Sequence, residues 1–244
     1  MNVLELILVH INGKIGSISY NFLENETSLS EGIDFIALRY PYYNRDLLQD
    51  ILSNEKYSVQ MILESMQSQL SIISKTDILK MCLFDALIGN SDRHHSNWGV
   101  ISRKTILKIE NGYIPAESIK MCPLYDNGSS LCSYINEEDI ENIIKDKMRY
   151  EAMLNTKSKS SIGWNKIRPI RHFKLVQYIK ETYYKETIDL VKLINQNITE
   201  DSIKKLLSQY STDIISSNMK ELLVKFLVDR KNKIINIYNL KSEV

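Results

Sequence analysis

Residues 84–99 have the sequence FDALIGNSDRHHSNWG, and they interrupt an otherwise apolar part of the chain. A helical pattern predicted over 76–89 stops at Gly89, a residue type that commonly ends helices. From Gly89 to Asn97 no residue has an apolar side chain, and a short apolar run, 98–101, follows. A polar loop between an apolar helix and an apolar strand is the first place to look for chemistry in this chain.

Two residues of this loop, Asp92 and Asn97, have the D-x-x-x-x-N spacing of a kinase catalytic loop. In such a loop the carboxylate orients an attacking hydroxyl and accepts its proton, and the amide oxygen binds a metal ion on the nucleotide phosphates. A hairpin predicted at 105–114 returns Asp126 beside Asn97, where a second carboxylate can hold the same magnesium ion. The spacing alone leaves an alternative open, in which a capped helix end and an Asx turn precede a plain loop at 126–128.

The rest of the chain is predicted to be a short β-hairpin followed mainly by helices. The hairpin covers residues 1–22, with Asn12-Gly13 as a type I′ turn signal, and residues 23–45 are predicted to be a loop. Nearly everything after Asn136 has apolar residues at helical spacing. The predicted helices are 44–51, 59–66, 76–89, 137–152, 171–183, 186–196, 199–210 and 217–240.

Composition is that of a globular protein. Hydrophobic residues make up 43% and charged residues 25%, which excludes a disordered chain. The net charge of +1 excludes binding to nucleic acid or membrane by bulk charge, and Gly (8) and Pro (4) are too few for a turn-rich all-β fold. No signal peptide or apolar run of 18 residues is visible. The three cysteines form no CxxC pair, so a cytoplasmic protein with reduced thiols and no membrane contact is expected.

The motifs also carry a family resemblance. Residues 84–99 resemble the catalytic segment of the HipA-like serine/threonine kinases, and Pro123-Leu124-Tyr125-Asp126 resembles the metal-binding PLYD segment of that family. Residues 16–22 (GSISYNF) resemble the strand that enters the hinge between the two kinase lobes. The resemblance implies an α+β fold, with residues 1–30 as a remnant N-lobe hairpin and hinge. Residues 31–244 are then the mainly helical C-terminal lobe of a HipA-like kinase.

Carried over by position, the resemblance implies roles for individual residues. Asp92 is implied as the catalytic base, and Asn97 and Asp126 as ligands of Mg²⁺ on bound ATP. Adenine contacts are implied for the backbone of residues 18–24. The residues assigned there are Ile18, Tyr20 and Phe22. The implied activity is ATP-dependent phosphoryl transfer to a serine or threonine of a protein substrate, in a toxin–antitoxin setting.

A HipA-like kinase also carries a Gly/Ser-rich phosphate loop and a strand lysine ahead of its hinge. Residues 13–17 (GKIGS) lack the spacing of such a loop, and Lys14 falls in the predicted turn. We therefore expect a split kinase, in which a small N-lobe-like or antitoxin protein supplies these groups by docking on the hairpin 1–22. Two alternatives stay open. One is a catalytically silent interaction module, and the other is a kinase of small molecules or lipids, because phosphatidylinositol kinases also contain a DRHxxN segment.

Less specific interpretations apply to the neighbours of Asp92 and to one basic segment. His94 and His95 are predicted to support the loop or to be exposed, because adjacent loop histidines point in different directions and would not share a metal ion. Arg93 is predicted to pair with an acid or a phosphate, or to be solvated. Residues 157–174 are basic, but a solvated loop leading into a helix explains them better than direct nucleic-acid binding. Nucleic acid is therefore expected only through a partner.

Overall fold

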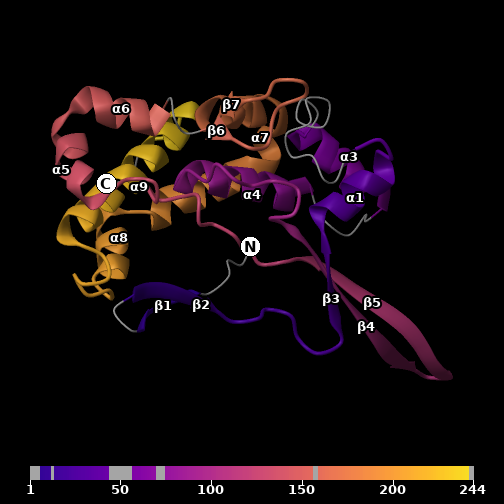
Figure 1. Cartoon of the computed structure of the whole chain (residues 1–244). Coiled ribbons are helices and arrows are strands. Elements are labelled where there is room, and N and C mark those ends of the chain that lie inside the picture. Colours follow the sequence, from indigo (N-terminus) through magenta and orange to yellow (C-terminus); the bar gives the residue numbers. More distant parts are fainter. Residues whose placement is uncertain (1–5, 12–13, 44–56, 70–74, 156–158, 242–244) are drawn as a thin grey trace.

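The computed structural model describes residues 6–11, 14–43, 57–69, 75–155 and 159–241. Helices predominate in this part of the chain, and the strands form small antiparallel sheets (Figure 1). The expected mixed and mainly helical architecture is thus confirmed. The predicted turn Asn12-Gly13 and the predicted helix 44–51 lie outside the described residues. No helix in the described ranges is long and apolar enough to cross a membrane.

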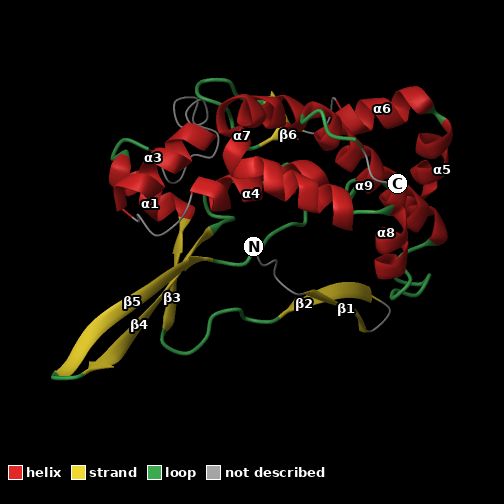
Figure 2. Ribbon diagram, turned by 180° about the vertical axis from the view of Figure 1, so that it is seen from behind, coloured by secondary structure: helices red, strands yellow, loops and turns green. Residues whose placement is uncertain are grey.

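The helices form one body, and the long strands lie largely outside it (Figure 2). The helices are α1 (Gly32–Arg39), α3 (Val59–Gln69), α4 (Lys75–Ile88), α5 (Glu137–Lys145), α6 (Lys147–Asn155), α7 (His172–Asn197), α8 (Glu200–Leu207) and α9 (Ser217–Ile237). The strands are β1 (Leu6–Ile11), β2 (Lys14–Ser19), β3 (Thr27–Glu31), β4 (Gly99–Ile109), β5 (Gly112–Met121), β6 (Lys159–Ser160) and β7 (Ile170–Arg171). Strand β1 pairs with β2, β6 pairs with β7, and β4 is the middle strand of the sheet β3-β4-β5.

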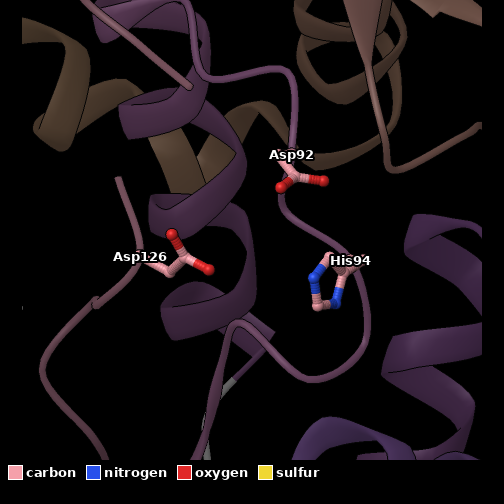
Figure 3. Close-up of side chains that lie close together, drawn as sticks. All are labelled: Asp92, His94 and Asp126. Carbon is pink, nitrogen blue, oxygen red and sulfur yellow. The ribbon is translucent and has the colours of Figure 1, made fainter. Parts of the chain in front are cut away.

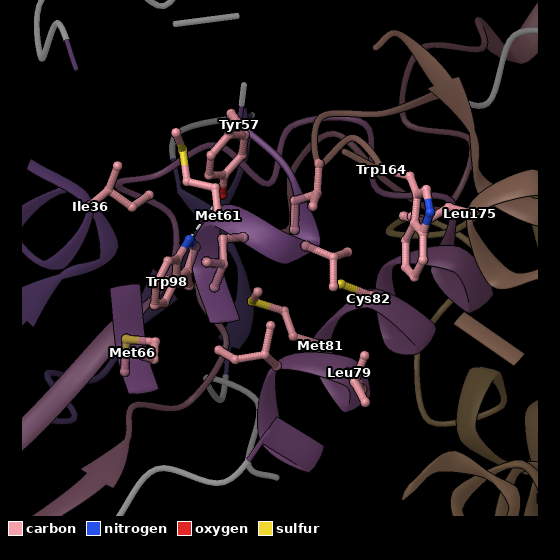
Figure 4. Close-up of a cluster of buried hydrophobic side chains, with 14 of the residues drawn as sticks. Ile36, Tyr57, Met61, Met66, Leu79, Met81, Cys82, Trp98, Trp164 and Leu175 are labelled. Carbon is pink, nitrogen blue, oxygen red and sulfur yellow. Dashed lines mark hydrogen bonds between the residues drawn. The ribbon is translucent and has the colours of Figure 1, made fainter. Parts of the chain in front are cut away.

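Helix α4 is the centre of the helical body. Its residues are buried on nearly every side from Ile78 to Ile88, as expected of a helix surrounded by other elements. It contacts α3, α7 and α9. Figure 4 shows Met81 and Cys82 of α4 among side chains from α3 and from the segments around Trp98 and Trp164. The polar loop after α4 therefore begins from a closely packed, buried helix.

Residues 27–39 form a strand and a helix where the sequence predicted a loop. Strand β3 pairs with β4 from Thr27↔Arg103 to Glu31↔Gly99, and α1 follows directly. The backbone N–H of Glu31 donates to Asp34 Oδ2 at 3.1 Å. Glutamate is not among the favoured N-cap residues, which explains why this helix start was missed.

The boundaries of the later elements differ from prediction in instructive ways. The predicted helix 137–152 is divided between α5 and α6 at Asp146. The predicted helices 171–183 and 186–196 are one element, α7, but Tyr183 has non-helical φ and ψ angles of −129° and 39°. The hairpin predicted at 105–114 is much longer, because β4 and β5 pair from Val100↔Met121 to Ile109↔Gly112. Its inner ends lead directly to Asn97 and to Asp126.

Candidate active site

The polar loop after α4 and the segment after β5 meet at one small space (Figure 3). Asp92, His94 and Asp126 each offer one ligand atom, and these atoms all lie within 4.8 Å of one another. Asp92 and His94 are partly buried, and Asp126 is exposed. Asp126 has a φ of 51°, in the left-handed region that non-glycine residues rarely adopt outside turns and functional sites. The hairpin thus brings two carboxylates together, as the sequence predicted.

Asn97 joins this site through the loop backbone. Its Nδ2 donates to the carbonyl oxygen of Asp92 at 2.8 Å. Because a carbonyl oxygen only accepts, this bond identifies the nitrogen end of the Asn97 amide. The amide oxygen is then the end that can bind a cation. The amide oxygen of Asn97 and the carboxylate of Asp126 are hard donors of the kind that suits Mg²⁺.

His94 is a member of this cluster, whereas the sequence predicted that it supports the loop or is exposed. Its Nδ1 accepts the backbone N–H of Ser96 at 3.2 Å. A neutral imidazole has one acceptor and one donor nitrogen, so Nε2 carries the proton. An N–H donor suits a carboxylate or phosphate oxygen better than it suits a metal ion. The position of His94 two residues after Asp92 was the only signal of this proximity in the sequence.

Every backbone carbonyl from Asp92 to Trp98 accepts a hydrogen bond. The N–H groups of His94 and Asn97 donate within the loop, at 2.9 and 3.0 Å. The other donors come from distant parts of the chain. They are the N–H groups of Gly32 and Ile33, the hydroxyls of Tyr57 and Tyr125, and the guanidinium of Arg93. Because its backbone carbonyls all have partners within the protein, the shape of the loop does not depend on a bound ligand.

Gly32 allows α1 to approach the loop closely. Its N–H donates to the carbonyl of Trp98 at 2.8 Å, and the N–H of Ile33 donates to the carbonyl of His95 at 2.9 Å. A Cβ atom on Gly32 would lie 2.2 Å from Trp98 Cε2. Loop carbonyls thereby satisfy two N–H groups at the start of α1 that have no partner within the helix, and these two hydrogen bonds hold the loop against α1.

The fully buried side chain of Arg93 connects the loop to α4 and to the segment after β5. Its Nε and Nη2 bind the carboxylate of Asp85 at N···O distances of 2.9 to 3.3 Å. Nη1 donates to the carbonyls of Asn97 and Tyr125, both at 2.6 Å, and Nη2 donates to Asn127 Oδ1 at 2.5 Å. Burial raises the pKa of Asp85, and the guanidinium opposes this rise. Arg93 therefore pairs with a buried acid, which was one of the interpretations left open, and it is not solvated.

Asn90 links this buried pair to Asp92. Its Nδ2 donates to Asp85 Oδ1 at 3.1 Å, and its Oδ1 accepts the N–H of Asp92 at 3.0 Å. Asn90 is completely buried. A chain of hydrogen bonds thus runs from α4 to the backbone of Asp92, and it fixes the position from which that carboxylate projects.

His95 faces a different environment from His94. Its Nδ1 lies 2.9 Å from the hydroxyl of Tyr43, and its ring is edge-on to Tyr43 and Tyr57. Burial, together with the smaller effect of the charges of His94 and Arg168, lowers the pKa of His95 to about 4. His95 is therefore neutral at pH 7 and supports the loop, with a tyrosine hydroxyl as its partner.

The hinge-like segment reaches the site through Phe22. The ring of Phe22 stacks on Tyr125 with a centroid distance of 5.8 Å and an interplanar angle of 21°. Strand β2 ends at Ser19, so Tyr20 and Phe22 lie in the loop after the strand that was predicted to contain them. Ile18 and Tyr20 are exposed. Adenine contacts at these three residues stay a prediction.

Comparison with known proteins finds similarity to a serine/threonine kinase in both sequence and structure. No protein-family model matches the chain. The chain is 22% identical over 247 residues to the serine/threonine-protein kinase CtkA of Helicobacter pylori, and the match covers 99% of this chain and 68% of that protein. The crystal structure of the proinflammatory kinase CtkA from H. pylori matches with a TM-score of 0.74 and 19% identity, over 98% of this chain and 76% of that chain. The chain thus has the fold of this part of a serine/threonine kinase.

Proposed function

We propose that this chain carries the catalytic site of an ATP- and Mg²⁺-dependent serine/threonine protein kinase of the HipA-like type. The strongest support is the meeting of Asp92 and Asp126, with Asn97 bonded to the backbone of Asp92, in a fold shared with a serine/threonine kinase. The D-x-x-x-x-N spacing and the PLYD segment agree with this assignment. The mainly helical region 31–244 corresponds in this proposal to the C-terminal lobe.

In the proposed reaction Asp92 acts on the acceptor hydroxyl. Its carboxylate takes the proton while the hydroxyl oxygen of serine or threonine forms a bond to the γ-phosphorus of ATP. The bond between the γ-phosphorus and the β–γ bridging oxygen breaks, and ADP leaves. The hydrogen bonds through Asn90 hold Asp92 in place for this step. His94 presents an N–H to the same space, where phosphate oxygens carry negative charge.

Asn97 and Asp126 are the proposed ligands of Mg²⁺. Both offer hard oxygen atoms, and nucleotide phosphates and water would complete the coordination. Magnesium supplies positive charge against the phosphate oxygens during transfer. Residues Ile18, Tyr20 and Phe22 are the proposed region of adenine contact, and the stacking of Phe22 on Tyr125 supports a link between that region and the site.

The groups that cover the phosphates come, in this proposal, from outside residues 1–244. The match to CtkA leaves about a third of that protein without a counterpart here, because it covers 68% of its length. We propose that a small N-lobe-like or antitoxin protein supplies a phosphate loop and a lysine in trans. The complex would act on a protein substrate in the cytoplasm as a growth-arresting toxin and would reach nucleic acid only through the partner. Phosphorylation of protein by the purified chain alone, at full rate, would refute the partner but leave the kinase assignment intact.

Substitution of the two carboxylates tests the kinase assignment. Asp92→Asn should lower phosphoryl transfer by about 10²–10⁴-fold, because it removes the base, while leaving Mg²⁺-dependent binding of a fluorescent ATP analogue nearly unchanged. Asp126→Asn should weaken that binding and also abolish transfer. Asp189→Asn, at an exposed position on α7, is the matched control and should change neither quantity.

Binding and transfer are both measured, because binding remains informative if the isolated chain transfers slowly. Circular dichroism of each variant checks that the fold is intact. Equal Mg²⁺-dependent nucleotide binding in the native chain and in Asp126→Asn would overturn the proposed metal site. Absence of Mg²⁺-dependent binding in the native chain and in its complex with a partner would favour a silent interaction module.

A further inference from the structure

The outer half of the β4–β5 hairpin extends beyond the rest of the sheet. Strand β3 accompanies β4 only as far as the pair Thr27↔Arg103, whereas β4 and β5 continue together to Ile109↔Gly112. We call residues 104–117 the outer ribbon. It projects away from the helical body (Figures 1 and 2). A two-stranded ribbon without a third strand or a covering helix is only marginally stable in water, so a binding partner would stabilise it.

The register shows which backbone groups of the outer ribbon are open. Ile109 and Gly112 are paired across a connection of only two residues, 110 and 111. In an antiparallel pair, either these two residues exchange both backbone hydrogen bonds or their neighbours do. The neighbours here are 110 and 111, which follow each other in the chain and cannot pair, so Ile109 and Gly112 form the hydrogen-bonded pair. Hydrogen-bonded and non-hydrogen-bonded pairs alternate along the ladder. Three residues of β4 therefore direct their N–H and C=O groups away from β5 beyond the end of β3. They are Lys104, Ile106 and Lys108.

The opposite edge of the ribbon is less suited to strand addition. Pro115 pairs with Ile106, so its nitrogen also points outward from the ladder. A proline nitrogen has no hydrogen, and it interrupts the row of donors that an added strand would need. The β4 edge has no proline, and it continues the line along which β3 already pairs with β4. An added strand would therefore extend the three-stranded sheet outward.

The two faces of the outer ribbon differ in character. One face is uncharged and exposes Leu107, Ile109 and Ile114, each 44 to 49% exposed. The other face carries Lys104 and Lys108 on the β4 edge, with the exposed Ile106 between them, and Tyr113, Pro115 and Glu117 on β5. Glu117 lies opposite Lys104, so the lysines are the charges of the β4 edge itself and the one acid of this face lies on the far strand. An open groove lies beside the ribbon where β3 begins. Its lining includes Lys104 and Ile106 of β4 and two acidic residues, Glu26 and Glu117.

The two lysines favour a partner other than a second copy of the chain. Symmetric antiparallel pairing of two β4 edges through Ile106 would place Lys104 opposite Lys108 of the other copy, and the same contact would occur twice. Like charges directly opposite each other destabilise a strand pair, and edge lysines are a known protection against self-pairing. An acidic strand would have the opposite effect.

We propose that the β4 edge from Lys104 to Lys108 binds an extended acidic segment of a partner polypeptide by strand addition. The segment would carry acidic residues opposite Lys104 and Lys108, and apolar residues opposite Thr105 and Leu107. Backbone hydrogen bonds would supply affinity, and the alternating side chains would supply specificity. The site lies outside the proposed catalytic cluster, so this inference does not depend on the kinase assignment.

Two synthetic peptides test the proposal on the full chain. The peptide TTEVTVETT matches the pattern, and TTKVTVKTT is its basic counterpart. At peptide concentrations up to about 1 mM, in the range of weak single-strand contacts, we expect only the acidic peptide to shift the amide NMR signals of residues 104–108. Slower hydrogen exchange at the Ile106 amide should accompany the shifts. Response to both peptides alike, or to neither, would overturn the proposal.

Two proline variants give a matched control for the edge. Ile106→Pro removes an outward N–H from β4 without removing a bond of the β4–β5 ladder, and it should weaken binding of TTEVTVETT by about tenfold or more. Tyr113→Pro makes the same change on the β5 edge and should leave binding unchanged. Equal affinity of the two variants would place the peptide elsewhere. Two other outcomes would refute the proposal if neither peptide binds. Insertion of the outer ribbon into phosphatidylglycerol vesicles would assign this surface to a membrane, and dimerisation through the outer ribbon would assign it to a second copy of the chain.

Discussion

Replacing Arg93 with lysine keeps the positive charge beside Asp85 and removes the planar fork of donors. In the native chain the guanidinium donates to the Asp85 carboxylate, to the carbonyls of Asn97 and Tyr125, and to Asn127 Oδ1. A lysine has three N–H donors on a single atom, and they cannot reach all of the acceptors that lie around different edges of the planar guanidinium. We expect at least two of these acceptors to lose their partner.

The size of the effect follows from the burial of the site. A buried acceptor left without a donor costs about 1–3 kcal/mol. The acceptors on Tyr125 and Asn127 are only partly buried, so the loss of two partners should lower the free energy of unfolding by about 2 kcal/mol. This is a large share of the roughly 5–15 kcal/mol that stabilises a typical domain. Arg103→Lys is the control, because Arg103 and its partner Glu24 are 49% and 65% exposed. Exposed pairs contribute about 0–1 kcal/mol, and the control should change stability by less than about 1 kcal/mol.

Urea unfolding followed by far-UV circular dichroism measures both variants, with the free energy of unfolding extrapolated to zero denaturant. If Arg93→Lys loses no more stability than Arg103→Lys, the reasoning about the buried guanidinium is wrong. A loss in Arg93→Lys with a changed denaturant slope would instead indicate that the unfolding transition is no longer two-state.

Two further predictions concern the surroundings of the loop. Gly32→Ala places a Cβ 2.2 Å from Trp98 Cε2, and overpacking of this kind costs about 1–3 kcal/mol or more. The Tm measured by circular dichroism should therefore fall by about 3 °C or more. An unchanged Tm would contradict the close approach of α1 to the loop. The pKa of His95 is about 4 in the folded chain, below its ordinary value of 6.5. Between pH 6.5 and pH 4 this histidine therefore binds a proton in the unfolded chain but not in the folded one. The free energy of unfolding should fall by up to about 3 kcal/mol as the pH drops from about 7 to about 4. His95→Gln should reduce this dependence, leaving the part due to the buried His172, whose pKa burial also lowers, and an identical pH dependence in the variant would exclude His95 as its source.

The part of the site that could be predicted from sequence is local. Asp92 and Asn97 belong to one loop, so their spacing could be read directly, and Asp126 could be placed beside them because a hairpin returns the chain. The pairing of Arg93 could not be decided, because its burial depends on how α4 packs, and Asp85 lies inside an otherwise apolar helical pattern. His94 was underestimated because its direction depends on a backbone bond from Ser96.

Secondary structure could be predicted where apolar residues recur at regular spacing. It could not be predicted where contacts between residues far apart in the sequence determine the structure. The late helices were recognisable from their apolar spacing, with errors mainly at breaks such as Asp146 and Tyr183. Helix α1 was missed because its start at Gly32 depends on Trp98, which lies far away in the sequence. The length of the β4–β5 hairpin was underestimated because its exposed outer half lacks a buried face, so alternation of apolar and polar residues is weak there.

The satisfied carbonyls from Asp92 to Trp98 have a consequence for control of this protein. Because all of these carbonyls already have a hydrogen-bond partner, the backbone has no reason to rearrange when a ligand binds. The structures without and with ligand should therefore superpose at these residues. Little ordering entropy then opposes binding here. We therefore expect regulation of this protein to control whether its ligands reach the site, and not to change the backbone conformation of residues 92–98.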